Sequence, residues 1–309
     1  MSDGRAVKVG VIGGSGLYEI EGIAKLREVR VATPFGKPSD AFITGELAGV
    51  PCAFLPRHGR GHRFLPTEIP FRANLWAMKS LGVTHVISLS AVGSLREEIV
   101  PGHFVVVDQF FDRTRQRAST FFGGGIVGHV VFADPVCNAL GATLVGAAKQ
   151  VGVTVHAGGT YVCMEGPAFS TRAESHFYRS IGGAVIGMTN LQEAKLAREA
   201  EIHYATIAMS TDYDCWHPHH EDVTVETVMK VMAANVGNAK ALVKAAIPKV
   251  AAAKCDSCDR ALASAVMTQR SVIPPAAVKK LAPMLGKYFP ELSKAKKASA
   301  AKAKSARRR

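Results

Sequence analysis

The chain has 309 residues, of which 48% are hydrophobic, so it is long and apolar enough to bury a large core. No apolar run approaches the ~20 residues that a membrane-spanning helix needs, and glycines interrupt the N-terminal apolar stretch before it could form a secretory signal. We therefore expect a cytoplasmic protein with no membrane association.

The net charge of +13 is concentrated at the C-terminus. Residues 294–309 read KAKKASAAKAKSARRR and hold eight basic residues and no acid, which leaves +5 for residues 1–293. A tail of this composition is expected to be disordered and to bind nucleic acid at most non-specifically. A polyanion-binding protein that acts through this tail stays open as a distant alternative.

Strand-like apolar runs alternate with helical patterns along the chain, which predicts an α/β fold: a single domain with a mixed, twisted sheet flanked by helices. In chain order we expect strands at 7–14 and 52–59, a helix at 71–81, strands at 84–91 and 103–111, a helix at 138–151, a strand at 154–164, a helix opening near 171, a strand at 184–188, a helix at 191–201, a strand at 203–211 and a long helix at 224–247. The main domain is expected to cover residues 1–250, followed by a C-terminal helical extension at 251–293 and the basic tail at 294–309.

Six cysteines are too few for a disulfide framework in a chain of this length. Four of them stand singly among apolar residues, as ordinary core thiols do: Cys52, Cys137, Cys163 and Cys215. Cys255 and Cys258 form a CxxC pair with no second pair nearby, so free thiols, a local disulfide, redox chemistry and a zinc site all stay open.

A glycine-rich segment, GVIGGSG at residues 10–16, follows the first expected strand. The dinucleotide-binding fingerprint fails here, because Glu19 stands where the pattern starting at Gly14 needs its last glycine. What remains is a loop whose backbone can approach an anion closely, with the Ser15 hydroxyl as a donor. A tight turn without a ligand is the alternative.

Two further strands are followed by residues that suit an anion. Arg57 and His58 lie in the basic turn that ends the second expected strand, and Ser90 and Ala91 lie where the third is expected to end. Ligands of open α/β sheets bind outside the carboxyl ends of the strands. These residues and Ser15 therefore predict a phosphate site at one edge of the sheet, with a solvated basic turn at Arg57 as the alternative.

Asp212 and Asp214 stand at the polar end of an apolar strand. If the strand continues through them, their spacing of two places both carboxyl groups on one face. Two close carboxyl groups resist double ionisation, so one can keep a proton and donate it to a leaving-group nitrogen. A solvent-facing turn is the alternative interpretation.

Eight motifs in this order resemble the methylthioadenosine phosphorylase branch of the trimeric purine nucleoside phosphorylase family over roughly residues 7–250. They are GVIGGSGLY (10–18), TPFGKPSD (33–40), RHGRGH (57–62), AVGSLREEIVPG (91–102), DQFFDRT (108–114), MEGPAFSTRAES (164–175), GMTN (187–190) and STDYDCW (210–216). The segments at 164–175 and 210–216 are the most specific. The resemblance implies a nucleoside phosphorylase-like fold.

The resemblance also assigns roles to single residues. The family's phosphate ligands correspond to Ser15, Arg57, His58, Ala91 and Thr189, with Ser15 standing where many relatives have threonine.

The residues that contact the nucleoside are implied in the same way. Met188 corresponds to a residue that packs against the ribose, and Phe169 and Ser170 to residues that orient the base. Asp212 and Asp214 match the pair that contacts N7 and the exocyclic amine of adenine.

The 5' end of the substrate and the oligomer are implied by the resemblance too. Val225, Val228 and Met229 match positions that line the 5' pocket, although ordinary helix packing would explain them equally well. His129 corresponds to a residue contributed by a neighbouring subunit, which implies a homotrimer.

The implied activity is phosphorolysis of 5'-methylthioadenosine to adenine and 5-methylthioribose 1-phosphate, a step of purine and methionine salvage. Inorganic phosphate is the co-substrate, and neither a metal nor an organic cofactor is expected. A phosphorylase for 6-oxopurine nucleosides or methylthioinosine is the alternative.

Overall fold

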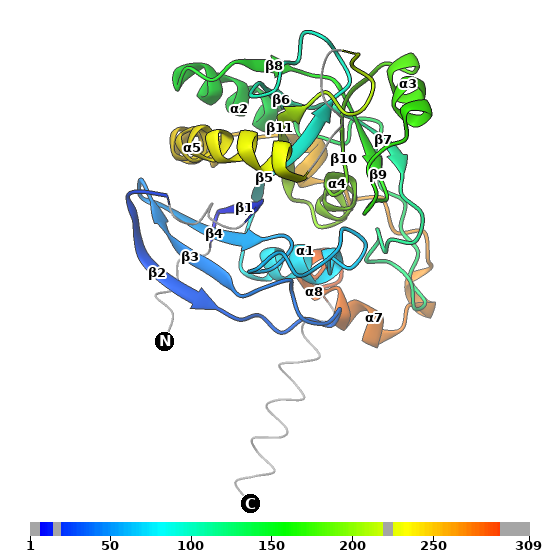
Figure 1. Ribbon diagram of the computed structural model, residues 1–309. Helices are drawn as coiled ribbons and strands as arrows, with labels where there is room; N and C mark the ends of the chain where they lie inside the picture. Colours follow the sequence, from blue (N-terminus) through cyan, green and yellow to red (C-terminus); the bar gives the residue numbers. More distant parts are fainter. Residues whose placement is uncertain (1–6, 15–19, 219–224, 291–309) are drawn as a thin grey trace, which may run out of the picture.

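The computed structural model describes residues 7–14, 20–218 and 225–290, and within them a mixed sheet of eleven strands is flanked by helices (Figure 1). The strands are β1 (Val9–Gly13), β2 (Ile23–Val29), β3 (Phe42–Leu47), β4 (Val50–Pro56), β5 (His85–Ser94), β6 (Phe104–Val106), β7 (Gln109–Arg113), β8 (Val155–Ala157), β9 (Thr160–Met164), β10 (Gly183–Gly187) and β11 (His203–Asp212). The helices are α1 (Phe71–Ser80), α2 (Asn138–Gln150), α3 (Arg172–Ser180), α4 (Asn190–Glu199), α5 (Val225–Val250), α6 (Asp256–Asp259), the 3₁₀ helix η1 (Arg270–Val272), α7 (Pro275–Lys280) and α8 (Ala282–Leu285). The predicted α/β class is confirmed.

The central strands are buried on both faces because helices cover each side of the sheet. Successive residues of a strand point to opposite faces. Ala205 and Ile207 of β11 pack in the cluster formed with α2 and α5, whereas Tyr204 packs in the cluster formed with α1 and α4. Figure 1 shows α2 and α5 together, apart from α1, α4 and α8. The core therefore consists of two apolar layers with the sheet between them.

The C-terminal extension packs on the second of these layers. Leu262, Val278 and Leu285 lie in the same buried cluster as Leu75 of α1. The indole Nε1 of Trp76 also donates to the Lys280 carbonyl at 2.9 Å. The extension thus continues the core of the main body, while the tail at 294–309 lies outside the described residues.

Two expected strands prove to be four. The segment predicted at 103–111 divides into β6 and β7, and the segment predicted at 154–164 divides into β8 and β9. Gly158 and Gly159 have φ angles of 84° and 127°, which glycine adopts without steric cost. The Gly159 amide donates to Asp108 Oδ1 at 2.9 Å, so the two segments bend at the same point. β6 then pairs in parallel with β8, and β7 pairs in parallel with β9.

β5 positions the site, because its two edges are paired differently. β11 pairs with one edge from His85 to Gly93. On the other edge β1 pairs only as far as Ser88, and β10 begins to pair at Gly93. Among the described residues, no strand pairs with residues 89–92 on that edge. We call this stretch the β5 gap; it lies at the carboxyl ends of β1, β4 and β5, where α/β sheets bind ligands.

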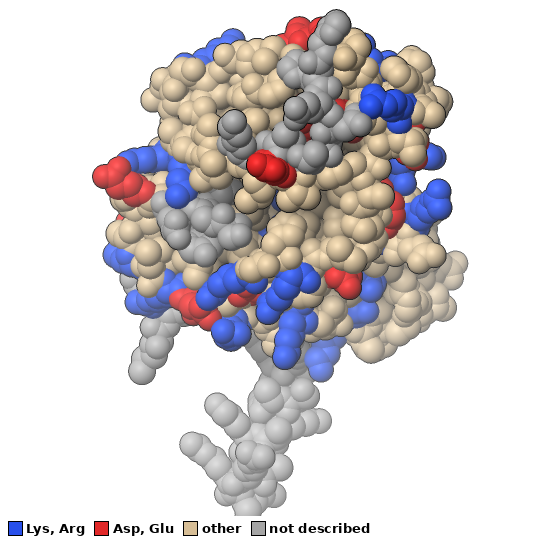
Figure 2. Space-filling model, viewed as in Figure 1, with Lys and Arg blue, Asp and Glu red and all other residues tan. Residues whose placement is uncertain are grey.

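Basic side chains gather over the lower part of the face seen in Figure 2, where β2, β3 and α1 lie, with acidic side chains among them. Several are paired: Lys25 Nζ lies 3.0 Å from Glu46 Oε2, and Arg60 NH2 lies 2.7 Å from Glu28 Oε2. This surface is therefore mixed in charge. None of the helices in the described part of the chain combines the length and apolarity needed to cross a bilayer.

Candidate active site

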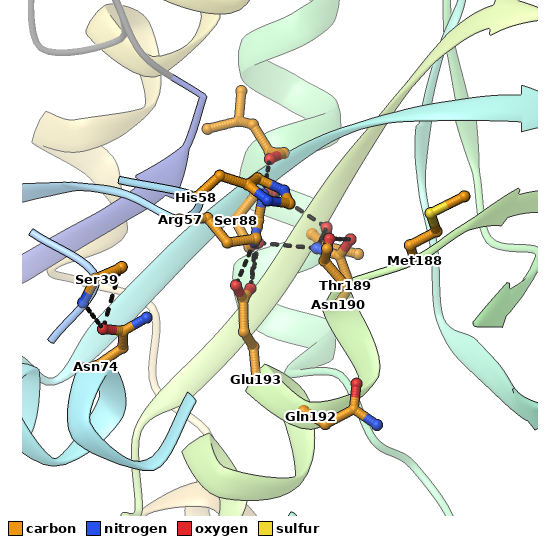
Figure 3. Close-up of polar contacts among 12 residues, drawn as sticks. Ser39, Arg57, His58, Asn74, Ser88, Met188, Thr189, Asn190, Gln192 and Glu193 are labelled. Carbon is orange, nitrogen blue, oxygen red and sulfur yellow. Dashed lines mark hydrogen bonds and ion pairs between the residues drawn. The ribbon is translucent and has the colours of Figure 1, made fainter. Parts of the chain in front are cut away.

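Arg57 fills the β5 gap from the end of β4 (Figure 3). Its backbone N–H donates to the Gly13 carbonyl at the end of β1, and its NH1 donates to the Leu89 carbonyl, at 2.9 Å in each case. Its side chain is only 3% exposed. Arg57 therefore joins the ends of β1 and β4 to the free edge of β5.

A buried ion pair holds this guanidinium. Arg57 Nε lies 2.5 Å from Glu193 Oε1, and its NH2 donates to Glu193 Oε2 at 3.1 Å and to the Ser88 hydroxyl at 2.6 Å. Burial alone would lower the pKa of Arg57, but the Glu193 carboxylate outweighs it and holds the pKa above its ordinary value. Most of the N–H donors of Arg57 thus bind protein groups, and the remaining NH1 donor is available to an anion.

The ion pair belongs to a larger polar network. Asn190, the first residue of α4, donates from Nδ2 to Ser88 Oγ at 2.8 Å and to Thr206 Oγ1 at 2.6 Å. Tyr204 Oη donates to Glu193 Oε2 at 3.0 Å. These groups are all buried, and each has hydrogen-bond partners. The network is therefore rigid and avoids the free-energy cost of an unpaired buried polar group. It ties α4 to β5 and β11 directly beneath the gap.

His58 follows Arg57 and is fixed in one tautomer. Its Nδ1 lies 2.8 Å from the Phe64 carbonyl, so Nδ1 carries the proton, and its ring stacks on His62 at a centroid distance of 4.2 Å. Burial lowers the pKa of His58 to about 4, and the Arg57 and His62 charges add to this effect. The neutral ring therefore presents Nε2 as an acceptor.

The other predicted phosphate residues border the gap. Ser90 and Ala91 lie inside β5, because pairing with β11 as far as Gly93 and with β10 at Gly93 and Ser94 extends the strand to Ser94. Ser90 Oγ is buried and has no hydrogen-bond partner within residues 7–14, 20–218 and 225–290. Thr189 is buried at the start of α4, beside Asn190 in Figure 3. Ser15 lies outside the described residues.

Asp212 and Asp214 are held by a turn, not by strand alternation. β11 ends at Asp212, and Asp214 adopts a left-handed φ of 51°, so the same-face expectation fails. Asp212 Oδ1 instead accepts from the Asp214 N–H at 2.8 Å, and Asp212 Oδ2 accepts from the Thr211 hydroxyl at 2.6 Å. Asp214 Oδ2 is buried and has no partner among the described residues. The turn thus leaves one carboxylate oxygen for a ligand.

Both carboxyl groups favour the protonated form more than an exposed aspartate does. Burial raises the pKa of Asp212, with a further contribution from the Asp214 charge, and the hydrogen bonds from Thr211 and the Asp214 N–H oppose it only in part. Burial also raises the pKa of Asp214, and the nearby hydroxyls of Ser175 and Ser170 oppose the shift only in part, although neither makes a hydrogen bond to Oδ2. A pair of this kind keeps a proton to higher pH than an exposed aspartate does.

Arg117 connects three segments of the chain near the gap. Its side chain is 1% exposed and donates to the Met188 carbonyl, to the Glu165 carbonyl at 2.5 Å and to Gln192 Oε1 at 3.1 Å. Met188 in turn packs against Gly166, where a Cβ would lie 2.5 Å from its sulfur. Arg117 therefore fixes Met188, the segment after β9 and the first turn of α4 relative to one another.

The segment that contains Phe169 and Ser170 precedes α3. Thr171 caps that helix in a full capping box with Glu174. The Cys215 thiol donates to the Ser170 carbonyl at 3.3 Å, which joins this segment to the aspartate turn. Phe169 is 45% exposed, so its ring face is open to a ligand.

A family model described as the phosphorylase superfamily matches residues 8–248. The chain belongs to the phosphorylase superfamily.

Individual members of the superfamily match almost the whole chain. S-methyl-5'-thioadenosine phosphorylase from Geobacter sulfurreducens is 58% identical over 281 residues, which cover 91% of this chain and 98% of that protein. A crystal structure of methylthioadenosine phosphorylase from an Antarctic soil metagenomic library is 46% identical, with a TM-score of 0.87, and covers 91% of this chain and 99% of that one. Methylthioadenosine phosphorylase from Schistosoma mansoni, in complex with adenine, is 38% identical with a TM-score of 0.77, covering 86% and 99%.

In the described part of the chain, four residues that the sequence assigned to the 5' pocket and the subunit boundary do not contact the residues around the β5 gap. Val225 and Met229, in the first turns of α5, are 70% and 63% exposed, and Val228 is partly buried. His129 is exposed, and its N–H donates to the Ala265 carbonyl of the C-terminal extension. The described contacts of a single chain do not join these residues to Arg57 or Asp212.

Sequence reasoning missed Glu193, Asn190 and Ser88, although they hold Arg57 in this superfamily member. The available signal was in α4: Asn190 and Glu193 are three positions apart, on the helix face that also buries Ala194 and Ala197. Polar residues on a buried helix face require partners. That pattern could have predicted a buried polar network between α4 and the sheet.

Proposed function

We propose that this protein catalyses phosphorolysis of 5'-methylthioadenosine, with inorganic phosphate as co-substrate, giving adenine and 5-methylthioribose 1-phosphate. The observation that carries the proposal is the near full-length similarity to S-methyl-5'-thioadenosine phosphorylases, because 98% coverage includes nearly every part of that enzyme. We further propose that it acts in the cytoplasm and that the reaction uses no metal or organic cofactor.

Phosphate is placed at the β5 gap in this proposal. Arg57 and Thr189 border the gap, which contains the Ser90–Ala91 backbone, and Ser15, outside the described residues, is proposed as a further donor. A phosphate bound there accepts from the NH1 donor that the Arg57–Glu193 pair leaves free, and its charge supports positive charge that develops on the ribosyl ring. His58 Nε2, as an acceptor, suits the hydroxyl group of a monoprotonated phosphate.

The base is placed between the aspartate turn and the segment at 165–170. Asp212, with its raised pKa, protonates N7 as the glycosidic bond breaks, and the free Oδ2 of Asp214 accepts from the 6-amino group. Phe169 and Ser170 orient the base, and Met188 packs against the ribose. The oxocarbenium-like ribosyl cation is then attacked by the phosphate held on its other side.

Asp214 also supports the choice of a 6-aminopurine. Its unpaired carboxylate oxygen would face the 6-oxo group of inosine or methylthioinosine, and two acceptors repel each other. Sites built to pair one polar group can discriminate strongly against an analogue that cannot pair.

We propose a homotrimer in which a neighbouring chain completes the 5' end of the site. Val225, Val228 and Met229 suit a methylthio group, and two of them are exposed in the single chain. His129, also exposed, would approach the site of a neighbouring copy. Contact with the substrate and the neighbouring chain would remove the surface of these apolar side chains from water, which is favourable.

A substrate panel with and without phosphate tests the proposal. We expect adenine and 5-methylthioribose 1-phosphate from methylthioadenosine only when phosphate is present, with much slower turnover of methylthioinosine and inosine. Release of free methylthioribose without phosphate would show a hydrolase instead. A preference for the 6-oxopurine nucleosides would show that Asp214 does not select the base as we propose.

A further inference from the structure

Three cysteines from two distant parts of the chain meet at the end of the sheet opposite the β5 gap. Cys137 is the N-cap residue of α2, Cys255 is the N-cap residue of α6, and Cys258 lies in α6. Their Sγ atoms all lie within 4.8 Å of one another, and Cys137 and Cys258 are buried. The sequence suggested that Cys137 is an ordinary core thiol; the structure instead joins it to the CxxC pair.

A histidine adjoins this cluster. His203, at the start of β11, places Nδ1 3.3 Å from Cys137 Sγ and Nε2 3.0 Å from Asp259 Oδ1. Its ring is 3% exposed and stacks on His85 at a centroid distance of 4.2 Å. A histidine that ligates a metal through one nitrogen usually donates from the other to a carboxylate, which fixes the ring and its tautomer. His203 and Asp259 have this arrangement.

We propose that Cys137, Cys255 and Cys258 bind a Zn²⁺ ion, with His203 Nδ1 as the fourth ligand. Tetrahedral zinc has Zn–S distances of about 2.3 Å, which separates the sulfurs by roughly 3.8 Å, so the three thiols need little adjustment. His203 Nδ1 is close to Cys137 Sγ but lies outside the group of ligand atoms within 4.8 Å of one another, so its ring must shift toward Cys255 and Cys258 when the ion binds. The CxxC spacing is common among zinc ligands. A disulfide would use only two of the three thiols and would leave the oriented imidazole without a role.

The ion is structural and takes no part in the reaction. β11 runs from His203 to Asp212, so the cluster lies about 30 Å along the strand from the aspartate turn, and about 13 Å from Ile207, which is in register with the start of the β5 gap. Cys255, Cys258 and Asp259 belong to the C-terminal extension, whereas Cys137 and His203 belong to the main body. Zinc at this point fastens the extension to the sheet where Leu262 N–H also donates to Glu201 Oε1 at 3.0 Å. A four-ligand site closed by protein is typical of structural zinc.

To test this, the full-length protein is reduced and stripped of bound metal, and its binding of added Zn²⁺ and Co²⁺ is then measured. We expect one equivalent of Zn²⁺ to bind, and Co²⁺ in its place to give the thiolate charge-transfer and intense visible bands of a tetrahedral site. Cys258→Ser should abolish both, whereas Cys52→Ala, which removes a buried thiol outside the cluster, should keep both.

Asp259 offers a variant with little risk to folding, since its side chain is 55% exposed. Asp259→Ala should weaken zinc binding by about 10–100-fold, as removal of such a supporting carboxylate does elsewhere. Asp256→Ala, in the same short helix, is the matched control and should have no effect. Reduced wild-type protein that binds neither metal would overturn the proposal. Purified protein with a disulfide among these three cysteines and no zinc would overturn it as well.

Discussion

Gly93 of β5 lies in register with Asp212 of β11, and a Cβ atom on Gly93 would lie 2.9 Å from Asp212 Oδ1. The same Cβ would lie 3.3 Å from Asp214 Cβ and 3.1 Å from Ile186 Cγ2. Contacts this short leave no room for a side chain. The glycine therefore allows the aspartate turn to approach β5 at the end of the gap.

We expect Gly93→Ala to displace Asp212 and to lower kcat/KM for methylthioadenosine by about 10²-fold, because small misplacements of reacting groups have effects of this size. Steady-state kinetics with both substrates measure this. Gly146→Ala, in α2, where an added Cβ meets no atom within 4 Å, is the control and should keep full activity. Equal kinetics in the two variants would contradict the proposed position of Asp212.

Asp212→Asn removes the proposed proton donor while keeping the size of the side chain. We expect kcat to fall by about 10²–10⁴-fold, the usual contribution of a positioned general acid, with little change in KM for phosphate. Asp40→Asn, at a partly buried aspartate of another segment, is the comparison. Unchanged kcat in Asp212→Asn would remove Asp212 from the mechanism.

The main body of the fold could be predicted because its central elements have clear apolar patterns. β1, β4 and β11 are buried along most of their length, and they appear in the sequence as continuous apolar runs. β2 was missed because Lys25, Arg27 and Glu28 are exposed, so this edge strand has neither an apolar run nor alternation.

Without the family resemblance, site residues could be predicted only where polar residues follow apolar strands. Arg57 and Asp212 stand at such ends and were recognised, whereas Glu193 lies inside a helix, where a charged residue normally faces solvent. The contact between Cys137 and Cys258 depends on how α6 folds back against the N-terminus of α2. No local pattern contains that information.

The buried pair of Arg57 and Glu193 should matter more for stability than the pairs on the surface. In Glu193→Gln the guanidinium stays buried without a counter-charge, and an amide NH₂ replaces an acceptor that three donors now share. We expect the free energy of unfolding to fall by about 3–5 kcal/mol in chemical denaturation. Glu28→Gln, which breaks an exposed pair with Arg60, should have a much smaller effect, because solvent screens that pair. Similar losses in both variants would show that the buried pair has no special role.

Arg117 should act as a positioning residue for the base and ribose segments. Lysine cannot bond the Met188 carbonyl, the Glu165 carbonyl and Gln192 together, because its donors lie at one point rather than on a planar fork. Arg117→Lys should therefore lower kcat/KM at least about 10-fold, with a larger rise in KM for the nucleoside than for phosphate. Arg115→Lys is the control, since Arg115 is exposed and its bond to Glu165 comes from the backbone. A normal nucleoside KM in Arg117→Lys would contradict this role.

Glu199, at the end of α4, should make stability depend on pH. Burial raises the pKa of Glu199 from 4.5 to about 7, although the Phe121 N–H and the Thr120 hydroxyl donate to the carboxylate and oppose the shift. Because the folded state holds this proton more tightly than the unfolded chain, the resulting stabilisation is complete below pH 4.5 and is lost as the pH rises through 7. Relative to Glu199→Gln, which does not titrate, the free energy of unfolding of the wild type should fall by roughly 3 kcal/mol over that range. Denaturation curves at several pH values measure the difference, from which other titrating groups cancel. Parallel pH profiles for the two proteins would mean that Glu199 ionises in the folded state as readily as in the unfolded chain.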